Sequence, residues 1–99
     1  MTNDIKLLLG IKIGTGIYHV GDIVRVKDKS GGIVFEGKIE FKKYLDGEGC
    51  YDDYHLGFVV SGNLYRGYRG YHATEETFTL LDLLSMARRN KWEVENARN

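Results

Sequence analysis

The sequence predicts a mainly β domain of the α+β kind, a small SH3-like open barrel with one short helix before its last strand. Apolar residues recur at every second position in several segments, which is the spacing of a strand with one buried face. The chain has 13 glycines and no proline, as in compact β domains with short hairpins. Near the C-terminus the apolar spacing changes to the helical period. With 99 residues and no visible linker or repeat, we expect a single domain over residues 1–99.

The first expected strand covers residues 5–13, where apolar residues alternate with lysine and glycine. The alternating residues are Ile5, Leu7, Leu9, Ile11 and Ile13. Gly14-Thr15-Gly16 interrupts the run, and residues 17–20 resume it. Because the 5–13 segment is long and apolar, it is also a candidate edge for pairing with a second subunit, so a homo-oligomer is among the expected partners.

The clearest local pattern is a β-hairpin made by residues 21–26 and 33–41 around a turn at Ser30-Gly31-Gly32. β-Branched residues alternate with charged ones in both strands, and the two turn glycines are expected to supply the positive φ of a tight reversal. The expected inward residues of the second strand are Ile33, Phe35, Ile39 and Phe41. Gly37 lies between them and predicts either a bulge or a close backbone approach.

The middle of the chain is less regular. Residues 44–54 lose the alternation and form an acidic, glycine-rich segment that we expect to be a loop. Residues 56–60 follow as a short and almost wholly apolar strand, typical of the centre of a sheet. Ser61-Gly62-Asn63 has the composition of a turn. Residues 65–72 then read Tyr-Arg-Gly-Tyr-Arg-Gly-Tyr-His, an unusual tyrosine- and arginine-rich segment.

A helix is expected from Thr79, because Thr79-Leu80-Leu81-Asp82 has the form of a capping box. Four apolar side chains should face the barrel from one helical stripe: Leu80, Leu81, Leu84 and Ala87. Arg88 and Arg89 are favourable near a helix C-terminus, and Asn90 is the expected end. Trp92 and Val94 alternate with glutamates, which predicts a closing strand.

Three short motifs occur in order along the chain: Gly21-Asp22-Ile23-Val24, Gly57-Phe58-Val59-Val60, and an ending from Leu81 to Asn96 in which a leucine-rich helix precedes Glu93-Val94-Glu95-Asn96. In this order the chain resembles the YopX family of small phage and prophage proteins, whereas its N-terminal portion departs from the family pattern. The resemblance implies a β-rich fold and a mobile-element origin. It implies no catalytic residues.

Charge and cysteine content narrow the function classes. The chain has 14 Lys and Arg against 14 Asp and Glu, a formal net charge of zero, which argues against a general nucleic-acid or membrane-surface binder. Cys50 is the only cysteine, so no intrachain disulfide can form, which fits a reducing compartment. The apolar run at residues 7–9 is too short for a signal-peptide core or a membrane span. We therefore expect a protein of the host-cell cytoplasm with no membrane partner.

The segment from residue 65 to residue 72 is the best candidate for a binding site. Its candidate contact residues are Tyr65, Arg66, Tyr68, Arg69, Tyr71 and His72. Tyrosine can stack on bases, arginine can stack or pair with phosphate, and glycine lets a backbone approach a ligand. The same residue types are enriched in protein interfaces. The alternative without a site is a twisted strand and loop with packed tyrosines and solvated arginines.

The acidic loop is a second candidate. Asp52 and Asp53 could contact a basic surface of a partner, and a solvated loop is the alternative. The loop lacks the residue order of a calcium site, and Asp52 with His55 finds no further ligand of a zinc or iron set. Cys50 has no evident activating group. We expect neither a metal nor a cofactor.

Two functions remain. The first is a non-enzymatic phage or prophage interaction protein that binds a host or phage protein, with inhibition of a host defence system as an occupation suggested by the implied origin. The alternative is binding of a nucleotide or single-stranded nucleic acid through residues 65–72, with affinity that falls as salt rises. An enzyme is not expected, because no pair or triad of reactive residues has a recognisable spacing.

Overall fold

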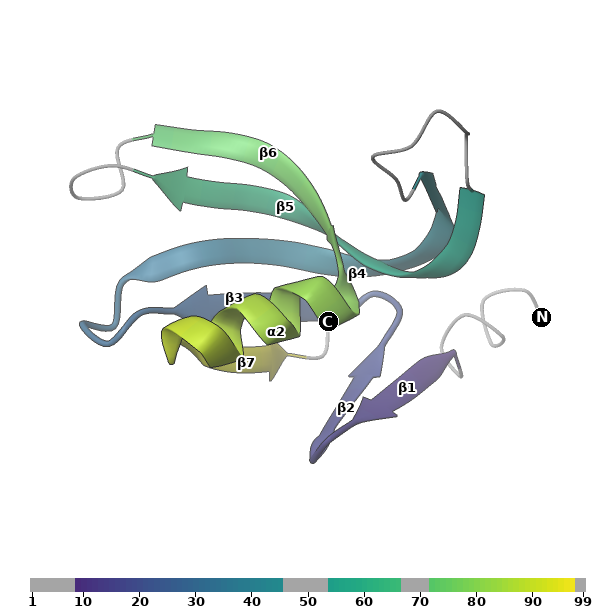
Figure 1. The fold of residues 1–99 in the computed structure, drawn as a ribbon, viewed down its shortest axis with the longest axis horizontal. Coiled ribbons are helices and arrows are strands. Elements are labelled where there is room, and N and C mark those ends of the chain that lie inside the picture. Colours follow the sequence, from purple (N-terminus) through teal and green to yellow (C-terminus); the bar gives the residue numbers. More distant parts are fainter. Residues whose placement is uncertain (1–8, 46–53, 67–71, 98–99) are drawn as a thin grey trace.

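The described strands form two antiparallel sheets, one of two strands and one of five with the order β6-β5-β4-β3-β7 (Figure 1). The computed structural model describes residues 9–45, 54–66 and 72–97. A single described helix, α2, precedes the last strand. The expectation of a mainly β fold with one short helix before the last strand is confirmed. The described strands do not close into a barrel.

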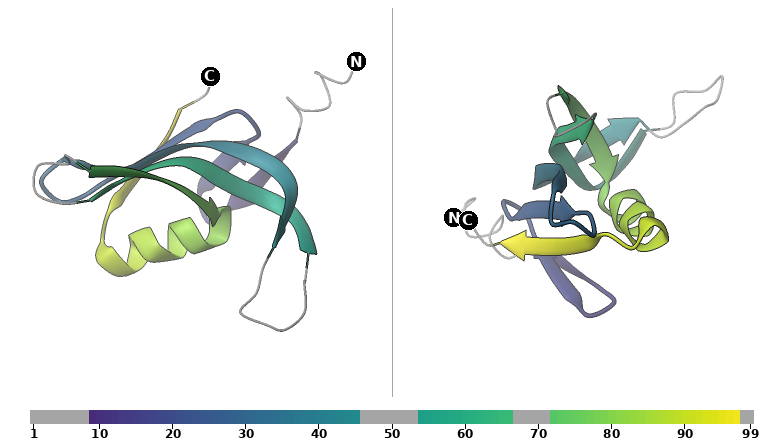
Figure 2. Two further views of the ribbon diagram at one scale, coloured as in Figure 1. Left: turned by 90° about the horizontal axis from the view of Figure 1, so that it is seen from above. Right: turned by 90° about the vertical axis from the view of Figure 1, so that its left-hand side faces the viewer.

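The elements follow the chain in a simple order. They are β1 (Gly10–Ile13), β2 (Gly16–His19), β3 (Ile23–Lys27), β4 (Ile33–Leu45), β5 (Tyr54–Arg66), β6 (His72–Thr79), α2 (Leu80–Asn90) and β7 (Glu93–Ala97). Strands β3 to β6 make an antiparallel meander, and β7 returns after the helix to pair with β3. Figure 2 shows that α2 lies on the concave side of the bent five-stranded sheet.

The predicted hairpin of residues 21–26 and 33–41 is confirmed as the β3–β4 pair. Of the two turn glycines, Gly31 alone has a positive φ, of 87°. The turn is held by Asp28, whose Oδ1 accepts hydrogen bonds from the Ser30 backbone N–H and the Gly32 backbone N–H, both at 2.9 Å. The Ser30 hydroxyl donates to the same oxygen at 2.6 Å. This side chain satisfies backbone donors that the turn leaves unpaired.

Strands β4 and β5 approach each other unusually closely at a pair of facing glycines, Gly37 and Gly62. A Cβ atom at Gly37 would lie 2.8 Å from the Ser61 carbonyl oxygen, and one at Gly62 would overlap the Glu36 carbonyl oxygen. The close approach expected at Gly37 is confirmed. The expected turn at residues 61–63 is wrong, because these residues lie within β5 and Gly62 is needed for the approach and not for a reversal.

The core lies between the concave face of the sheet and α2. Its fully buried side chains come from three strands and the helix, and the largest are Phe35, Ile39, Leu80, Leu83, Val24, Val26 and Val60. Phe35 contacts Phe78 edge to face, with ring centroids 5.3 Å apart. Such edge-to-face pairs add to the stabilisation that burial provides.

Three residues expected in the core are exposed. Phe41 lies toward the outer end of β4, past the residues that pair with β3, and is exposed. Ile33 is exposed because a register shift at Val26/Lys27 places it opposite Lys27, so that Val34 packs against the core instead. Leu81 is 60% exposed, and Leu83 is buried in its place. The reason is the phase of the helix: with Leu80 facing the sheet, the positions three and seven residues later share its side, whereas Leu81 is turned away by about 100°.

The predicted start and end of the helix are confirmed. Thr79 is the N-cap, and its Oγ1 accepts a hydrogen bond of 3.1 Å from the backbone N–H of Asp82. The helix ends at Asn90, and Lys91 follows in the left-handed conformation with φ 58°. The expected closing strand is β7.

A buried carboxylate joins the β1–β2 hairpin to the larger sheet. Asp22 is 3% exposed, and its Oδ2 accepts hydrogen bonds from the His19 backbone N–H at 3.0 Å and from Asn96 Nδ2 at 3.1 Å. The same Asn96 amide donates to the Ile17 carbonyl oxygen at 2.8 Å. Because Asn96 belongs to β7, these bonds fix the hairpin beside the end of the sheet. Ile11 and Ile13 of that hairpin pack against the core.

Candidate functional site

The structure describes three residues of the predicted tyrosine- and arginine-rich site. Tyr65 and Arg66 end β5, His72 begins β6, and Arg66 is the register partner of His72. Arg66 and His72 are exposed, and Tyr65 is half-buried. The other three expected contacts lie outside the described residues: Tyr68, Arg69 and Tyr71. The described part of this site is thus one end of the β5–β6 ribbon.

The acidic candidates Asp52 and Asp53 also lie outside the described residues, as does Cys50. Their segment joins the sheet at Tyr54, the first residue of β5, whereas the tyrosine- and arginine-rich segment joins it at Arg66, the last. Twelve steps of about 3.3 Å separate these two points along the strand, and they lie at opposite ends of the β4–β5–β6 ribbons (Figure 1). The two candidate segments are therefore attached at different places and do not share one anchor.

The outer end of β4 and β5 is a two-stranded ribbon, which we call the arm (residues 41–45 and 54–58). Strand β3 pairs with β4 only as far as Lys38, and β6 pairs with β5 only from Val59 onward. The arm therefore has no neighbour in the sheet on either side among the described strands. Free backbone donors and acceptors on such an edge are available for pairing with another strand.

The arm exposes large apolar side chains. Leu56 is 67% exposed, and Leu45 and Phe41 are exposed as well. Phe41 is steadied by an edge-to-face contact with Phe58 of the opposite strand, with ring centroids 5.0 Å apart. A two-stranded ribbon is marginally stable by itself in water, and neighbouring exposed apolar side chains mark interaction sites.

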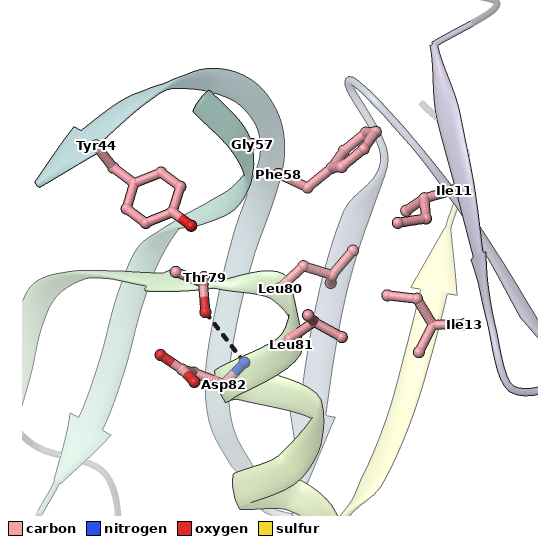
Figure 3. A pocket seen from close by; sticks show the side chains of 9 residues that line it. All are labelled: Ile11, Ile13, Tyr44, Gly57, Phe58, Thr79, Leu80, Leu81 and Asp82. Carbon is pink, nitrogen blue, oxygen red and sulfur yellow. Dashed lines mark hydrogen bonds between the residues drawn. The ribbon is translucent and has the colours of Figure 1, made fainter. Parts of the chain in front are cut away.

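Two cavities lie at the base of the arm, and Tyr44 lines both of them. The first has a volume of about 400 Å³ and lies between the arm, β1 and the first turn of α2. Figure 3 shows Phe58 and Leu80 on one side of it and Ile11 and Ile13 on the other. The second, of about 350 Å³, lies between the arm and β6. Both cavities reach Asp82 at the start of the helix.

Tyr44 owes its position to a glycine. A Cβ atom at Gly57 would lie 3.4 Å from Tyr44 Cε1, so the ring packs across the bare backbone of the opposite strand. This covering of a strand glycine by a cross-strand aromatic is a known way of stabilising a ribbon. The ring thereby lines both cavities at the base of the arm.

The outer face of the sheet carries charged side chains that pair with one another, whereas the arm exposes apolar side chains. Arg25 Nε lies 2.6 Å from Glu36 Oε2, Lys27 Nζ lies 3.0 Å from Glu95 Oε1, and Arg25 also approaches Glu95 at 3.9 Å. The hydrogen bond and charge of Glu36 raise the pKa of Arg25. In these ion pairs the positive and negative charges of three strands neutralise each other, which leaves this face less suited to phosphate binding.

No cluster of three or more potential metal ligands occurs among the described residues. The one helix in the described part of the chain is not long and apolar enough to cross a membrane. Comparison with known proteins found no matching family model, no matching curated protein and no matching solved structure.

Sequence reasoning missed the arm. It placed Phe41 in the core and assigned no role to Tyr44, Leu45 or Leu56. The signal that could have found it is that the apolar residues of the 33–45 and 54–60 segments continue past the length that one short helix can cover. A helix of 11 residues spans about 16 Å, whereas a strand of 13 residues spans about 43 Å.

Proposed function

We propose that this chain is a non-enzymatic interaction protein that binds a partner protein through the arm. The observation that carries the proposal is the exposure of Phe41, Leu45 and Leu56 on a ribbon whose two edges are free among the described strands. A partner segment that adds to the arm as a strand would pair with its backbone. It would also cover these apolar side chains, at a gain of about 25 cal/mol per Å² removed from water.

The kind of partner follows from the resemblance to the YopX family. A protein of the host or of the phage is the expected partner, inhibition of a host defence system is the expected consequence, and the cytoplasm of the host cell is the expected location. Support for the location is the single cysteine, which fits a reducing compartment.

We also infer that the five-stranded sheet is an SH3-like open barrel. Its support is the meander β3-β4-β5-β6 followed by a helix and by β7, which returns to pair with β3. Figure 2 shows that β4 and β5 are strongly curved, and such curvature is what a barrel of this kind needs. This fold serves many unrelated functions, so the arm, and not the barrel, carries the functional proposal.

The proposal is tested by capture from a host lysate with three matched proteins: wild type, Leu56→Ser on the arm, and Ile33→Ser at the opposite end of β4. Both substituted residues are exposed leucine or isoleucine, so both variants should fold with little change in the urea midpoint. We expect a partner that wild type and Ile33→Ser retain and that Leu56→Ser retains about tenfold less. Equal capture by all three proteins would mean that the arm is not the binding surface.

A second candidate function is binding of a nucleotide or single-stranded nucleic acid at the other end of β5. One observation favours it: the β5–β6 register places exposed Arg66 opposite exposed His72, with Tyr65 adjacent. Binding of a fluorescent oligonucleotide should weaken as salt rises and should weaken further in Arg66→Ala. No change in anisotropy at low salt would eliminate this candidate.

A further inference from the structure

The helix α2 has two sides of different character. One side is buried against the sheet through Leu80, Leu83 and Ala87. The other side is exposed and forms the outermost layer of the molecule there (Figure 2). It carries, in order along the helix, Leu81 and Asp82, then Ser85, then Arg88 and Arg89. We infer that this exposed side is the contact between two copies of this chain, packed antiparallel about a two-fold axis that passes near Ser85.

The charges on this side are self-complementary. Asp82 lies three residues before Ser85 and Arg88 three residues after it, so the two charges are about 9 Å apart along the helix axis. A two-fold axis near Ser85 places Asp82 opposite Arg88 of the partner subunit, and the reverse, so that two equivalent ion pairs form. Parallel packing would instead oppose like charges. Among the described residues, no ion pair involves Asp82 or Arg88.

The apolar features on this side are self-complementary as well. Leu81 is 60% exposed and Ile17, across from it on the β1–β2 hairpin, is 57% exposed. Between the hairpin and α2 lies a hollow of about 740 Å³, whose lining includes Leu81, Leu84 and Arg88. In the antiparallel arrangement, Leu81 of each copy lies over the C-terminal half of the other helix, beside this hollow. The small side chain of Ser85 at the axis allows the helix axes to approach to about 8–10 Å.

The helix dipole by itself explains part of this pattern. An acidic residue in the first turn and a basic residue in the last turn both stabilise an isolated helix. The dipole does not explain why two large apolar side chains, Leu81 and Ile17, are exposed on the same side. Contact with a second copy accounts for the apolar and the charged residues together.

The test is a charge exchange read by light scattering over a series of protein concentrations. Asp82→Arg and Arg88→Asp each oppose like charges twice in the dimer, so each variant alone should raise the dissociation constant about tenfold or more. An equimolar mixture of the two variants should restore a heterodimer of wild-type affinity, because Asp82 then faces only Arg88 and the two new side chains face each other. Leu81→Ser should weaken the dimer without such rescue.

The dimer test needs a check of folding and a control variant outside the proposed contact. Urea midpoints close to wild type in all variants show that the fold is intact. A wild-type monomer at every concentration up to about 1 mM, or a mixture no better than either variant alone, overturns the inference and leaves this side for a different partner. Leu56→Ser on the arm should leave the dimer unchanged, so failure of the dimer and failure of the proposed function are distinguishable.

Discussion

The two halves of the long strands β4 and β5 have similar alternation but opposite surroundings. In the inner half, Phe35, Ile39 and Val60 are buried between the sheet and α2. In the arm, Phe41, Leu45 and Leu56 continue the apolar character but are exposed. The close approach at Gly37 and Gly62 lies within the inner half. The difference shows that one pair of strands can run from a buried core into an exposed apolar ribbon. The proposed partner surface is the part of the strands that the helix does not cover.

The largest change in unfolding free energy is expected from truncating Phe35 of the inner half, with Phe41 of the arm as the comparison. Phe35→Ala empties a site that is almost fully buried, and we expect it to lower the free energy of unfolding by about 3 to 5 kcal/mol. Phe41→Ala removes an exposed ring and its contact with Phe58, at about 1 kcal/mol. Urea unfolding followed by circular dichroism measures both. Similar losses in the two variants would mean that the arm is part of the core.

Gly62 of the inner half and Gly57 of the arm allow the same comparison between the two halves of the strands. Gly62→Ala forces a Cβ atom onto the Glu36 carbonyl oxygen, and we expect a loss of about 3 kcal/mol because backbone must move. Gly57→Ala in the arm meets only Tyr44 at 3.4 Å, so its unfolding free energy should stay within about 0.5 kcal/mol of wild type. A tolerated alanine at position 62 would contradict the proposed need for the close approach.

The helix that covers the inner half depends on its N-cap. Thr79→Ala removes the acceptor of the 3.1 Å hydrogen bond from Asp82 and should lower the unfolding free energy by about 1 kcal/mol. Thr79→Ser keeps a hydroxyl at the same place and serves as the control. The two unfolding midpoints in urea should therefore differ, and coincident midpoints would show that the cap contributes nothing measurable.

The smallest effect is a dependence on acid pH at the turn before β4. The hydrogen bond from the Ser30 hydroxyl, with a smaller contribution from the Gly32 backbone N–H, lowers the pKa of the Asp28 carboxyl. The unfolded chain therefore takes up this proton more readily than the folded one. The resulting stabilisation is fully present above the ordinary Asp pKa of about 3.9 and is lost as the pH falls through the lower folded-state pKa. Asp28→Asn should show a flatter acid branch of the urea midpoint against pH than wild type.

How far the sequence predicts this fold depends on whether a pattern is local. The β3–β4 hairpin and the capped helix were predicted correctly, because alternation, a Gly turn and a capping Thr act within a few residues. Strand β6 was not predicted, since six of its eight positions lack an apolar side chain and only Ala73 and Phe78 are apolar. The turn expected at residues 61–63 was wrong because Gly62 faces Gly37 of the neighbouring strand, a residue far away in the sequence.

The site was harder to predict for a related reason. Alternation tells which face of a strand a side chain occupies but not whether anything covers that face, so Phe41 was expected inside. Leu81 was expected inside because helical spacing allowed it to share a stripe with Leu80, Leu84 and Ala87. Leu80, Leu81, Leu83 and Leu84 also place leucines on more than one side of α2, so spacing by itself does not choose the buried stripe. Only the phase set by the packed helix decides that Leu83 is covered and Leu81 exposed.

The most direct test of the arm as the binding surface is amide hydrogen exchange with and without the captured partner. We predict that the partner slows exchange in residues 41–45 and 55–58 of the arm, while the inner residues 35–39 and 60–64 exchange slowly in both states. Slowing confined to residues 65, 66 and 72, with the arm unchanged, would contradict the account and place the binding site at the other end of β5.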